Sequence, residues 1–177
     1  MSEPAQVIIR DATRGDATAI AEIYNEAVKN TVAIWNDVTV SADNRITWLE
    51  EHWGKGYPVF VATLNDEVVG YATFSDFRNF DGFRHTVENS VYVHPNFHGR
   101  GIGGVLLRAT IEAARQAEKH VLVAAIEGSN AGSIALHEKY GFQRVGLLPQ
   151  VGTKFGCWLD MLLMQITLSL DDQPSAD

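Results

Sequence analysis

Residues 91–104 read VYVHPNFHGRGIGG, and they determine how the surrounding chain is interpreted. The apolar run at the start is typical of a strand, and Pro95 ends it. Four of the six residues from Gly99 to Gly104 are glycine. Glycine leaves room for a ligand's backbone and permits the dihedral angles that aim consecutive N–H groups into one concavity. The apolar spacing after the turn predicts a helix over about residues 103–117, whose N-terminus adds unpaired amides and a positive dipole end.

This glycine-rich turn predicts a cradle for a pyrophosphate group. The alternative is a tight strand–helix connection that binds nothing. Two other phosphate motifs fit less well. A P-loop ends in Gly-Lys-Ser/Thr, which residues 91–104 lack, and the dinucleotide fingerprint lies near the start of a parallel βαβ unit.

The chain on either side of the turn alternates strand and helix patterns. Apolar side chains from Ala19 to Val28 recur with a helical period, and Asp16 is expected to cap that helix. Ser41 or Asp43 is expected to open a second helix. The expected elements are strands at about 7–10, 59–64, 68–74, 88–93, 121–126, 143–147 and 157–168, and helices at about 19–28, 46–53, 103–117 and 130–140. This mixture indicates an α/β or α+β domain around a mixed sheet.

Length and composition indicate one domain, residues 1–170, followed by a disordered tail, residues 171–177. Apolar residues make up 46% of the chain, and no apolar run reaches the ~20 residues of a membrane span, so no membrane association is expected. The net charge of −8 argues against a nucleic-acid-binding protein. The single cysteine, Cys157, excludes an internal disulfide, and the N-terminus lacks a secretory signal pattern. A cytoplasmic location is therefore expected.

The turn and a later segment together carry a family pattern. The turn reads HGRGIG at residues 98–103, after a strand and before a helix. The later segment reads VAAI at 123–126 and NAGSIALHEKYGF at 130–142. In this order the two segments resemble the GNAT superfamily of acyl-CoA-dependent N-acetyltransferases, with His98 in place of the family's usual Gln or Arg. The resemblance implies a mixed, mostly antiparallel central sheet flanked by helices, with splayed strands that hold acetyl-CoA.

Three further stretches extend the resemblance over nearly the whole chain. They read TVAIWN at residues 31–36, FDGFRHTVENSVYV at 80–93 and PQVGTKFG at 149–156. These stretches resemble the branch of phosphinothricin and methionine sulfoximine acetyltransferases. The resemblance implies acetyl transfer from acetyl-CoA to the α-amine of a small amino acid analogue such as L-phosphinothricin, L-methionine sulfoximine or methionine sulfone. It also implies a homodimer, and the apolar residues of the last strands are candidates for its interface.

The resemblance assigns cosubstrate-binding residues one by one. The main chain of one strand would pair with the pantetheine arm, the glycine turn would hold the pyrophosphate, and the start of the later helix would meet either the pantetheine arm or the thioester region. One backbone N–H near Val91 would face the thioester oxygen and stabilise the charge that develops there. The expected acetyl-CoA-binding residues are Val91, Tyr92, Val93, Gly99, Arg100, Gly101, Ile102, Gly103, Gly104, Asn130 and Ser133.

Two residues are candidates for proton transfer. An amine attacks only when neutral, so a carboxylate near the thioester is needed to remove its proton, and Glu88 lies on the strand that leads into the cradle. The alternative for Glu88 is an ordinary strand carboxylate facing solvent. His137 occupies the place where many relatives carry a tyrosine that protonates the departing thiolate, and imidazole titrates close to neutrality. The alternative for His137 is a helix histidine that caps or packs.

The segment at residues 77–84, which follows the strand expected at 68–74, offers two guanidinium groups among aromatic rings. A substrate carboxylate is bound well by a bidentate arginine, so Arg78 and Arg84 are the candidates, although each could be a solvated loop charge. The full set of expected substrate residues is Arg78, Phe80, Asp81, Gly82, Phe83, Arg84, Lys154 and Trp35. The histidines show no ligand spacing, so no metal is expected.

Two other functions remain open at this point. One is acetylation of protein N-termini or lysines, which would need an open groove rather than an enclosing loop. The other is a non-catalytic acyl-CoA sensor, which would not need both Glu88 and His137.

Overall fold

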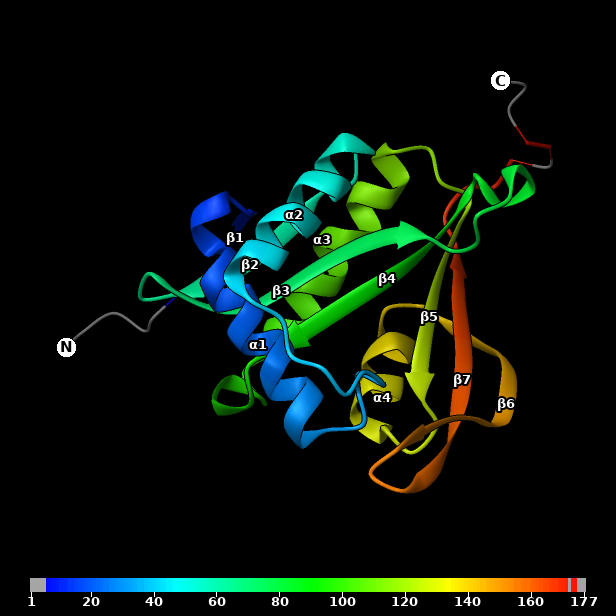
Figure 1. Ribbon diagram of the computed structural model, residues 1–177. Helices are drawn as coiled ribbons and strands as arrows, with labels where there is room; N and C mark the ends of the chain where they lie inside the picture. The colour runs from blue at the N-terminus through cyan, green and yellow to red at the C-terminus, as the bar shows by residue number, and fades with distance from the viewer. Residues whose placement is uncertain (1–5, 172, 175–177) are drawn as a thin grey trace.

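The computed structural model describes residues 6–171 and 173–174 and places them around one seven-stranded sheet. The strand order is β1-β2-β3-β4-β5-β7-β6 (Figure 1). The strands are β1 (Ile8–Asp11), β2 (Val59–Leu64), β3 (Glu67–Asp76), β4 (Thr86–Val93), β5 (Val121–Glu127), β6 (Gln143–Lys154) and β7 (Cys157–Thr167). The helices are α1 (Ala17–Asn30), α2 (Ala42–Gly54), α3 (Ile102–Gln116) and α4 (Ala131–Lys139), with 3₁₀ turns η1 (Arg14–Asp16), η2 (Asp81–Phe83) and η3 (Pro95–Phe97). Of the expected disordered tail, residues 172 and 175–177 lie outside the described residues.

The sheet is antiparallel except at its centre, where β4 and β5 run parallel. This parallel pairing extends only from Thr86–Val121 to Glu88–Val123. Figure 1 shows that β4 and β5 start side by side and then diverge toward their C-terminal ends. The expected mixed sheet with splayed strands is therefore confirmed. The divergence leaves one edge of β4 without a strand partner beyond Glu88.

Two helices cover each face of the sheet. Helices α1 and α2 pack on one face of β2 and β3, through a cluster that contains Ile20, Leu49 and Tyr71. Helices α3 and α4 lie on the opposite face, where Leu107 and Ile134 pack with side chains of β5. The helix-period pattern of the sequence places these apolar stripes against the sheet. Both helix layers reach β4, the strand beside which the candidate active site lies.

Two details of the expected structure are wrong. Asp16 precedes α1, but its carboxylate does not cap the helix; it accepts two hydrogen bonds from Arg10, both of 2.8 Å, and one from the Thr13 N–H at 2.7 Å. Asp16 itself ends the turn η1 with helical dihedral angles, and the side chain is used to fasten that turn to β1. The strand expected to end near Leu147 runs on to Lys154, with register shifts on the way. β6 is an edge strand, where Pro149 and bulges are tolerated.

Candidate active site

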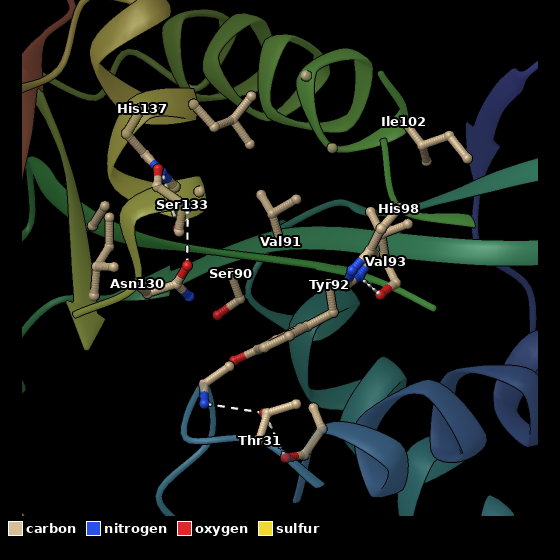
Figure 2. Close-up of a pocket in the computed structure, with 18 of the residues that line it drawn as sticks. Thr31, Ser90, Val91, Tyr92, Val93, His98, Ile102, Asn130, Ser133 and His137 are labelled. Atoms are coloured by element: carbon tan, nitrogen blue, oxygen red, sulfur yellow. Dashed lines mark hydrogen bonds between the residues drawn. The ribbon is translucent and has the colours of Figure 1, made fainter. Parts of the chain in front are cut away.

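A cleft of about 570 Å³ opens where β4 and β5 part. One wall is β4 and the other is β5 with α4, while the glycine turn lies at one end (Figure 2). Every expected acetyl-CoA residue except Arg100 lines this cleft, and so does His137. The other residues in the lining are Ile23, Ala27, Thr31, Ala33, Asn89, Ser90, Pro95, Phe97, His98, Ala124, Ala125, Ile126, Glu127, Gly132 and Leu136.

The glycines of the turn serve two different purposes. Gly99 and Gly101 have φ angles of 75° and 77°, in the left-handed region that favours glycine, and a Cβ on either would meet nothing within 4 Å. A side chain at these positions would therefore occupy open space beside the start of α3. Gly104 is needed for packing instead, because a Cβ there would lie 2.7 Å from the Tyr140 hydroxyl. At its glycines the turn thus presents backbone to the cleft, and Ile102 adds a buried side chain to the lining.

His98 fastens the turn to the strand that precedes it. Its Nε2 lies 2.8 Å from the Val93 carbonyl oxygen, and Figure 2 shows this contact at the end of β4. The ring donates this hydrogen bond, since a carbonyl oxygen only accepts. His98 therefore supplies a hydrogen-bonding side chain at the position where the family usually has Gln or Arg.

The free edge of β4 supplies the second wall with backbone groups. Residues Asn89 to Val93 are paired with β3 on one side, but β5 has moved away on the other. Backbone N–H and C=O groups at such an edge need partners, and a ligand with amide groups is well suited to pair with them. Val91 and Tyr92 point to opposite faces of the strand, Tyr92 toward the loop that carries Thr31 (Figure 2).

The start of α4 faces this edge across the cleft. The Asn130 side chain caps the helix by accepting a 3.0 Å hydrogen bond from the Ser133 N–H. Figure 2 shows both side chains beside the cleft, opposite β4. The cap holds the helix N-terminus, with its positive dipole end, against the cleft.

His137 is buried at the inner end of the cleft, one turn further along α4. Its Nδ1 lies 2.8 Å from the Ser133 carbonyl oxygen, and its Nε2 lies 3.1 Å from Nδ2 of Asn89. The ring also meets the edge of Phe142 at 4.9 Å between centroids. Burial lowers the pKa of His137, although the Ser133 carbonyl opposes this shift. The imidazole is therefore neutral near pH 7, with both nitrogens engaged in hydrogen bonds.

Glu88 lies on the other face of β4 from Asn89 and His137, because neighbouring residues of a strand alternate. It occupies the last position at which β4 pairs with β5, and it is partly buried. Burial raises the pKa of the Glu88 carboxyl, while the nearby Arg78 charge lowers it by less. The residue does not line the cleft itself. Its carboxylate thus lies at the point where β4 and β5 part, on the face of β4 opposite Asn89.

The expected substrate residues lie outside the cleft lining. The Arg78 guanidinium donates a hydrogen bond to the Phe77 carbonyl and sits 4.3 Å above the Phe77 ring, and its charge reaches Glu88. Arg84 donates to the Asp81 carbonyl at 3.0 Å. The aromatic side chains of the same segment, Phe80 and Phe83, are exposed. The segment therefore borders the Glu88 side of the sheet rather than the cleft.

Lys154 and Trp35 join the loop after α1 to the edge strand β6. The Lys154 ammonium is buried and donates to the Ile34 carbonyl, and burial lowers its pKa. The Trp35 ring lies directly on Gly152, where a Cβ would stand 2.2 Å from ring carbons. Thr31 and Ala33 of the same loop line the cleft. These contacts fix the position of the loop that borders the cleft on the α1 side.

Replacing Gly152 with alanine is expected to displace this loop. The added methyl group cannot share space with the Trp35 ring, so the ring and the residues beside it must move. We expect a loss of about 1–3 kcal/mol in the free energy of unfolding. Urea denaturation checks this value, and Gly146→Ala on the same strand is the control, because its Cβ would meet nothing within 4 Å. Equal stability of the two variants would contradict the contact.

Sequence reasoning missed several side chains of the cleft. Thr31 and Ala33 reach it from the loop after α1; they lie in the family-like stretch at residues 31–36, of which only Trp35 was expected at the site. Asn89 could have been found, because strand alternation places it opposite Glu88 and therefore toward α4. Glu127 is buried in the lining and accepts hydrogen bonds from the Ser129 N–H and hydroxyl, at 3.1 Å and 2.6 Å. The sequence predicts that Glu127 lies at the end of a buried strand, but it does not predict the hydrogen bonds from Ser129.

Comparison with known families agrees with this geometry. The model of the acetyltransferase (GNAT) family matches residues 20–142. The chain belongs to this family. It is 55% identical over 168 residues to the L-amino acid N-acyltransferase MnaT of Escherichia coli (strain K12). The aligned region covers 95% of this chain and 98% of MnaT. It is 54% identical, with the same coverage, to the L-methionine sulfoximine/L-methionine sulfone acetyltransferase of Salmonella typhimurium. This GNAT protein is therefore an acetyltransferase.

Solved GNAT structures share the whole architecture. The structure of yncA from Salmonella typhimurium with its cofactor acetyl-CoA superposes with a TM-score of 0.95 at 53% identity, over 97% of this chain and 99% of that one. A phosphinothricin acetyltransferase from Sinorhizobium meliloti in complex with acetyl-CoA gives a TM-score of 0.92 at 36% identity, over 96% and 93%. The GNAT fold expected from residues 98–103 together with 123–126 and 130–142 is thus confirmed.

Among the described residues, no three His, Cys, Asp or Glu side chains gather as a metal site requires. No helix within residues 6–171 and 173–174 is long and apolar enough to cross a bilayer.

Proposed function

We propose that this GNAT protein transfers the acetyl group of acetyl-CoA to the α-amine of a small amino acid analogue. L-methionine sulfoximine, methionine sulfone and L-phosphinothricin are the expected acceptors, since similar proteins carry those substrates in their names. The observation that carries the proposal is the cleft itself. A glycine-rich turn lies at one end, and an unpaired strand edge leads away from it. A diphosphate joined to an extended amide-containing arm matches these two features in turn.

The proposed roles follow from the placement of each group. Gly99 to Gly104 bind the pyrophosphate, and the edge of β4 pairs with the pantetheine arm. A backbone N–H near Val91 stabilises the thioester oxygen as charge develops on it. Glu88 removes the proton of the attacking amine, directly or through one water. The raised pKa of the buried Glu88 carboxyl favours this role, because a base works best when its pKa lies nearer the working pH.

A substrate panel tests the function. Acetyl-CoA is mixed with single amines, and the release of the free thiol is followed over time. We expect fast release with methionine sulfone, methionine sulfoximine or phosphinothricin, and slow release with peptides. Fast release with peptides would favour a protein acetyltransferase. Binding of acetyl-CoA with no release for any amine would favour a non-catalytic sensor.

Arg78 is proposed to help select the substrate carboxylate. Its guanidinium lies near enough to Glu88 to affect that carboxyl's pKa, so both groups border the same region. Arg78→Ala should raise the Michaelis constant for an amino acid by about tenfold, and that for its amide much less, because only the acid has the charge to lose. Steady-state kinetics with the acid and amide forms measure this difference. Arg14→Ala, a surface arginine paired with Glu50, is the control. Equal effects on acid and amide would assign Arg78 to the loop alone.

We also propose a cytoplasmic homodimer. Apolar side chains of β6 and β7 are exposed, among them Leu147, Val151 and Trp158. Exposed apolar groups on neighbouring strands are typical of an interface. The single free cysteine, Cys157, favours a reducing compartment. Light scattering of the purified protein measures the mass in solution.

A further inference from the structure

Arg45, near the start of α2, is a buried cation that forms no ion pair. Only 8% of the residue is exposed. None of the ion pairs made by the described residues includes it. Removing a charge from water costs free energy, which an opposite charge normally offsets. The surroundings of Arg45 therefore show what takes the place of a carboxylate.

Two aromatic rings and one amide hold the Arg45 guanidinium in place. Its central carbon lies 4.8 Å from the centroid of the Tyr24 ring of α1 and 4.9 Å from that of Trp48. Along one edge, Nε and Nη2 donate to Oδ1 of Asn44, at 3.1 Å and 2.7 Å. These contacts stabilise the charge in part, and they fix the orientation of the planar group.

The other edge of the guanidinium is a donor fork that no protein acceptor uses. Nη1 donates no hydrogen bond within residues 6–171 and 173–174, and Nη2 has a second N–H besides the one directed at Asn44. Nη1 is not one of the polar atoms of those residues that are both sealed from solvent and unpartnered, so it is accessible. Two N–H groups side by side match the two oxygens of a carboxylate.

This fork borders a polar pocket of about 660 Å³, which we call the Arg45 pocket. It shares no lining residue with the cleft between β4 and β5. The Tyr24 hydroxyl accepts a 2.6 Å hydrogen bond from Nδ2 of Asn36, which leaves the hydroxyl proton for a ligand. The N-terminus of α2 adds a positive dipole end. The lining consists of Tyr24, Asn36, Asp37, Val38, Thr39, Val40, Ser41, Asn44 and Arg45.

The backbone around the Arg45 pocket is fastened to α1. The Val40 N–H donates to Oδ1 of Asn25 at 2.8 Å, and Nδ2 of Asn25 donates to the Val40 carbonyl at 2.9 Å. Ser41 then caps α2 by accepting a 3.1 Å hydrogen bond from the Asn44 N–H. Donors that are already fixed lose little freedom when they bind a small anion.

The carboxylates near this pocket limit the charge of its ligand. Asp37 is in the lining, and Asp43 is in the first turn of α2 outside the lining. Burial lowers the pKa of Lys154 and the Asp37 charge opposes this shift, so Asp37 lies near that ammonium. Because the lining already carries one negative charge, a singly charged anion fits it better than a phosphate dianion.

We infer that the Arg45 pocket binds the carboxylate of a small organic acid, with the Nη1–Nη2 edge as a bidentate donor and the Tyr24 hydroxyl as a further donor. This site is independent of the proposed acetyl transfer, and it is distinct from the proposed substrate group Arg78. The loop between α1 and α2 forms part of the Arg45 pocket on one side and borders the cleft through Thr31 and Ala33 on the other.

Nuclear magnetic resonance of the full ¹⁵N-labelled chain tests the site, with acetate and glycine as probes. The backbone amides of residues 36–45 are followed while the probe is added at constant ionic strength. We expect shifts that saturate and are confined to these residues, with an acetate dissociation constant on the order of millimolar. Tighter binding of glycine than of acetate would assign the site to amino acids, whose ammonium meets Asp37. Otherwise the site takes acids without an amine.

Arg45→Met keeps an unbranched side chain between the rings but removes the fork, so acetate should bind at least about tenfold more weakly. Tyr24→Phe keeps the ring and removes one neutral donor, so it should weaken binding about 2–10-fold. Arg144→Met is the control, because Arg144 is an exposed arginine paired with Glu138 outside the pocket. Its affinity for acetate should equal that of the wild type.

The wild-type titration alone can overturn the site. Shifts that do not saturate, or that lie outside residues 36–45, contradict it, and so does unchanged affinity in a folded Arg45→Met protein. If Arg45→Met does not fold, Tyr24→Phe and the position of the wild-type shifts decide. Since neither acetyl-CoA nor acetyl transfer enters the measurement, failure of the proposed function leaves its result unchanged.

Discussion

Glu88→Gln is expected to lower turnover by about 10²–10⁴-fold, which is the usual contribution of general acid–base catalysis. Glutamine has the size of glutamate but cannot take a proton from the amine. Burial raises the pKa of Glu88, so the wild-type rate should rise with pH through a value above the ordinary carboxyl range. This limb reflects the ionisation of Glu88, whose pKa is raised from its ordinary value by burial, and it should shift or vanish in the variant. Stopped-time thiol assays at a series of pH values measure both effects.

The affinity for acetyl-CoA should barely change in Glu88→Gln, because Glu88 does not line the cleft. Glu67→Gln is the matched control, since Glu67 is an exposed carboxylate at the start of β3. If Glu88→Gln kept near-normal turnover and the same pH limb, the base would be solvent or another group. Glu88 would then be assigned to holding the substrate or the strand.

Gly101→Leu is expected to raise the dissociation constant of acetyl-CoA by about 10–100-fold, which corresponds to ~1.4–2.8 kcal/mol. Gly101 is the N-cap of α3 and lines the cleft, and a Cβ there enters open space beside the turn. The side chain would compete with the phosphates for that space. The left-handed φ of 77° adds a strain of roughly 1–2 kcal/mol to the folded protein.

Gly56→Leu separates these two effects. Gly56 has a φ of 74°, and its Cβ would also meet nothing within 4 Å, but it follows α2 and lies outside the cleft lining. The two variants should lose similar stability in thermal unfolding, and only Gly101→Leu should lose affinity in calorimetry. Unchanged affinity in a folded Gly101→Leu protein would refute the phosphate cradle.

The glycine turn and the periodic segments were predictable because their signals are local. The run at residues 121–126 and the spacing after Gly103 fixed a strand and a helix near their observed bounds. The length of the edge strand β6 was underestimated. Pro149 and Gly152 would interrupt a central strand, but they are tolerated in an edge strand. A sequence does not state where in the sheet a strand will lie. The prediction that Asp16 caps α1 was wrong for a similar reason, because tertiary structure brings Arg10 to its carboxylate instead.

The cleft was predictable on the side formed by continuous motifs and not on the others. The turn, the strand to Val93 and the start of α4 are each contiguous in sequence, and they meet as expected. The hydrogen bond between Asn89 and His137 joins residues 48 positions apart, and only the parting of β4 from β5 brings them together. The loop fixed by Lys154 likewise depends on a contact across 120 residues. Such pairings come from topology, which local patterns do not contain.

The short parallel pairing of β4 with β5 also affects how the chain is held together. Within the described sheet, β1 to β4 pair with the half made of β5, β7 and β6 through three residue pairs of β4 and β5. A ligand lying along the free edge of β4 would act as a partial extra strand between these halves. Because such a ligand binds the folded chain and not the unfolded one, it adds about 2.7 kcal/mol of stability at a hundred times its dissociation constant. With acetyl-CoA bound along this edge as proposed, the resistance of the protein to unfolding in a cell would depend on the supply of the thioester.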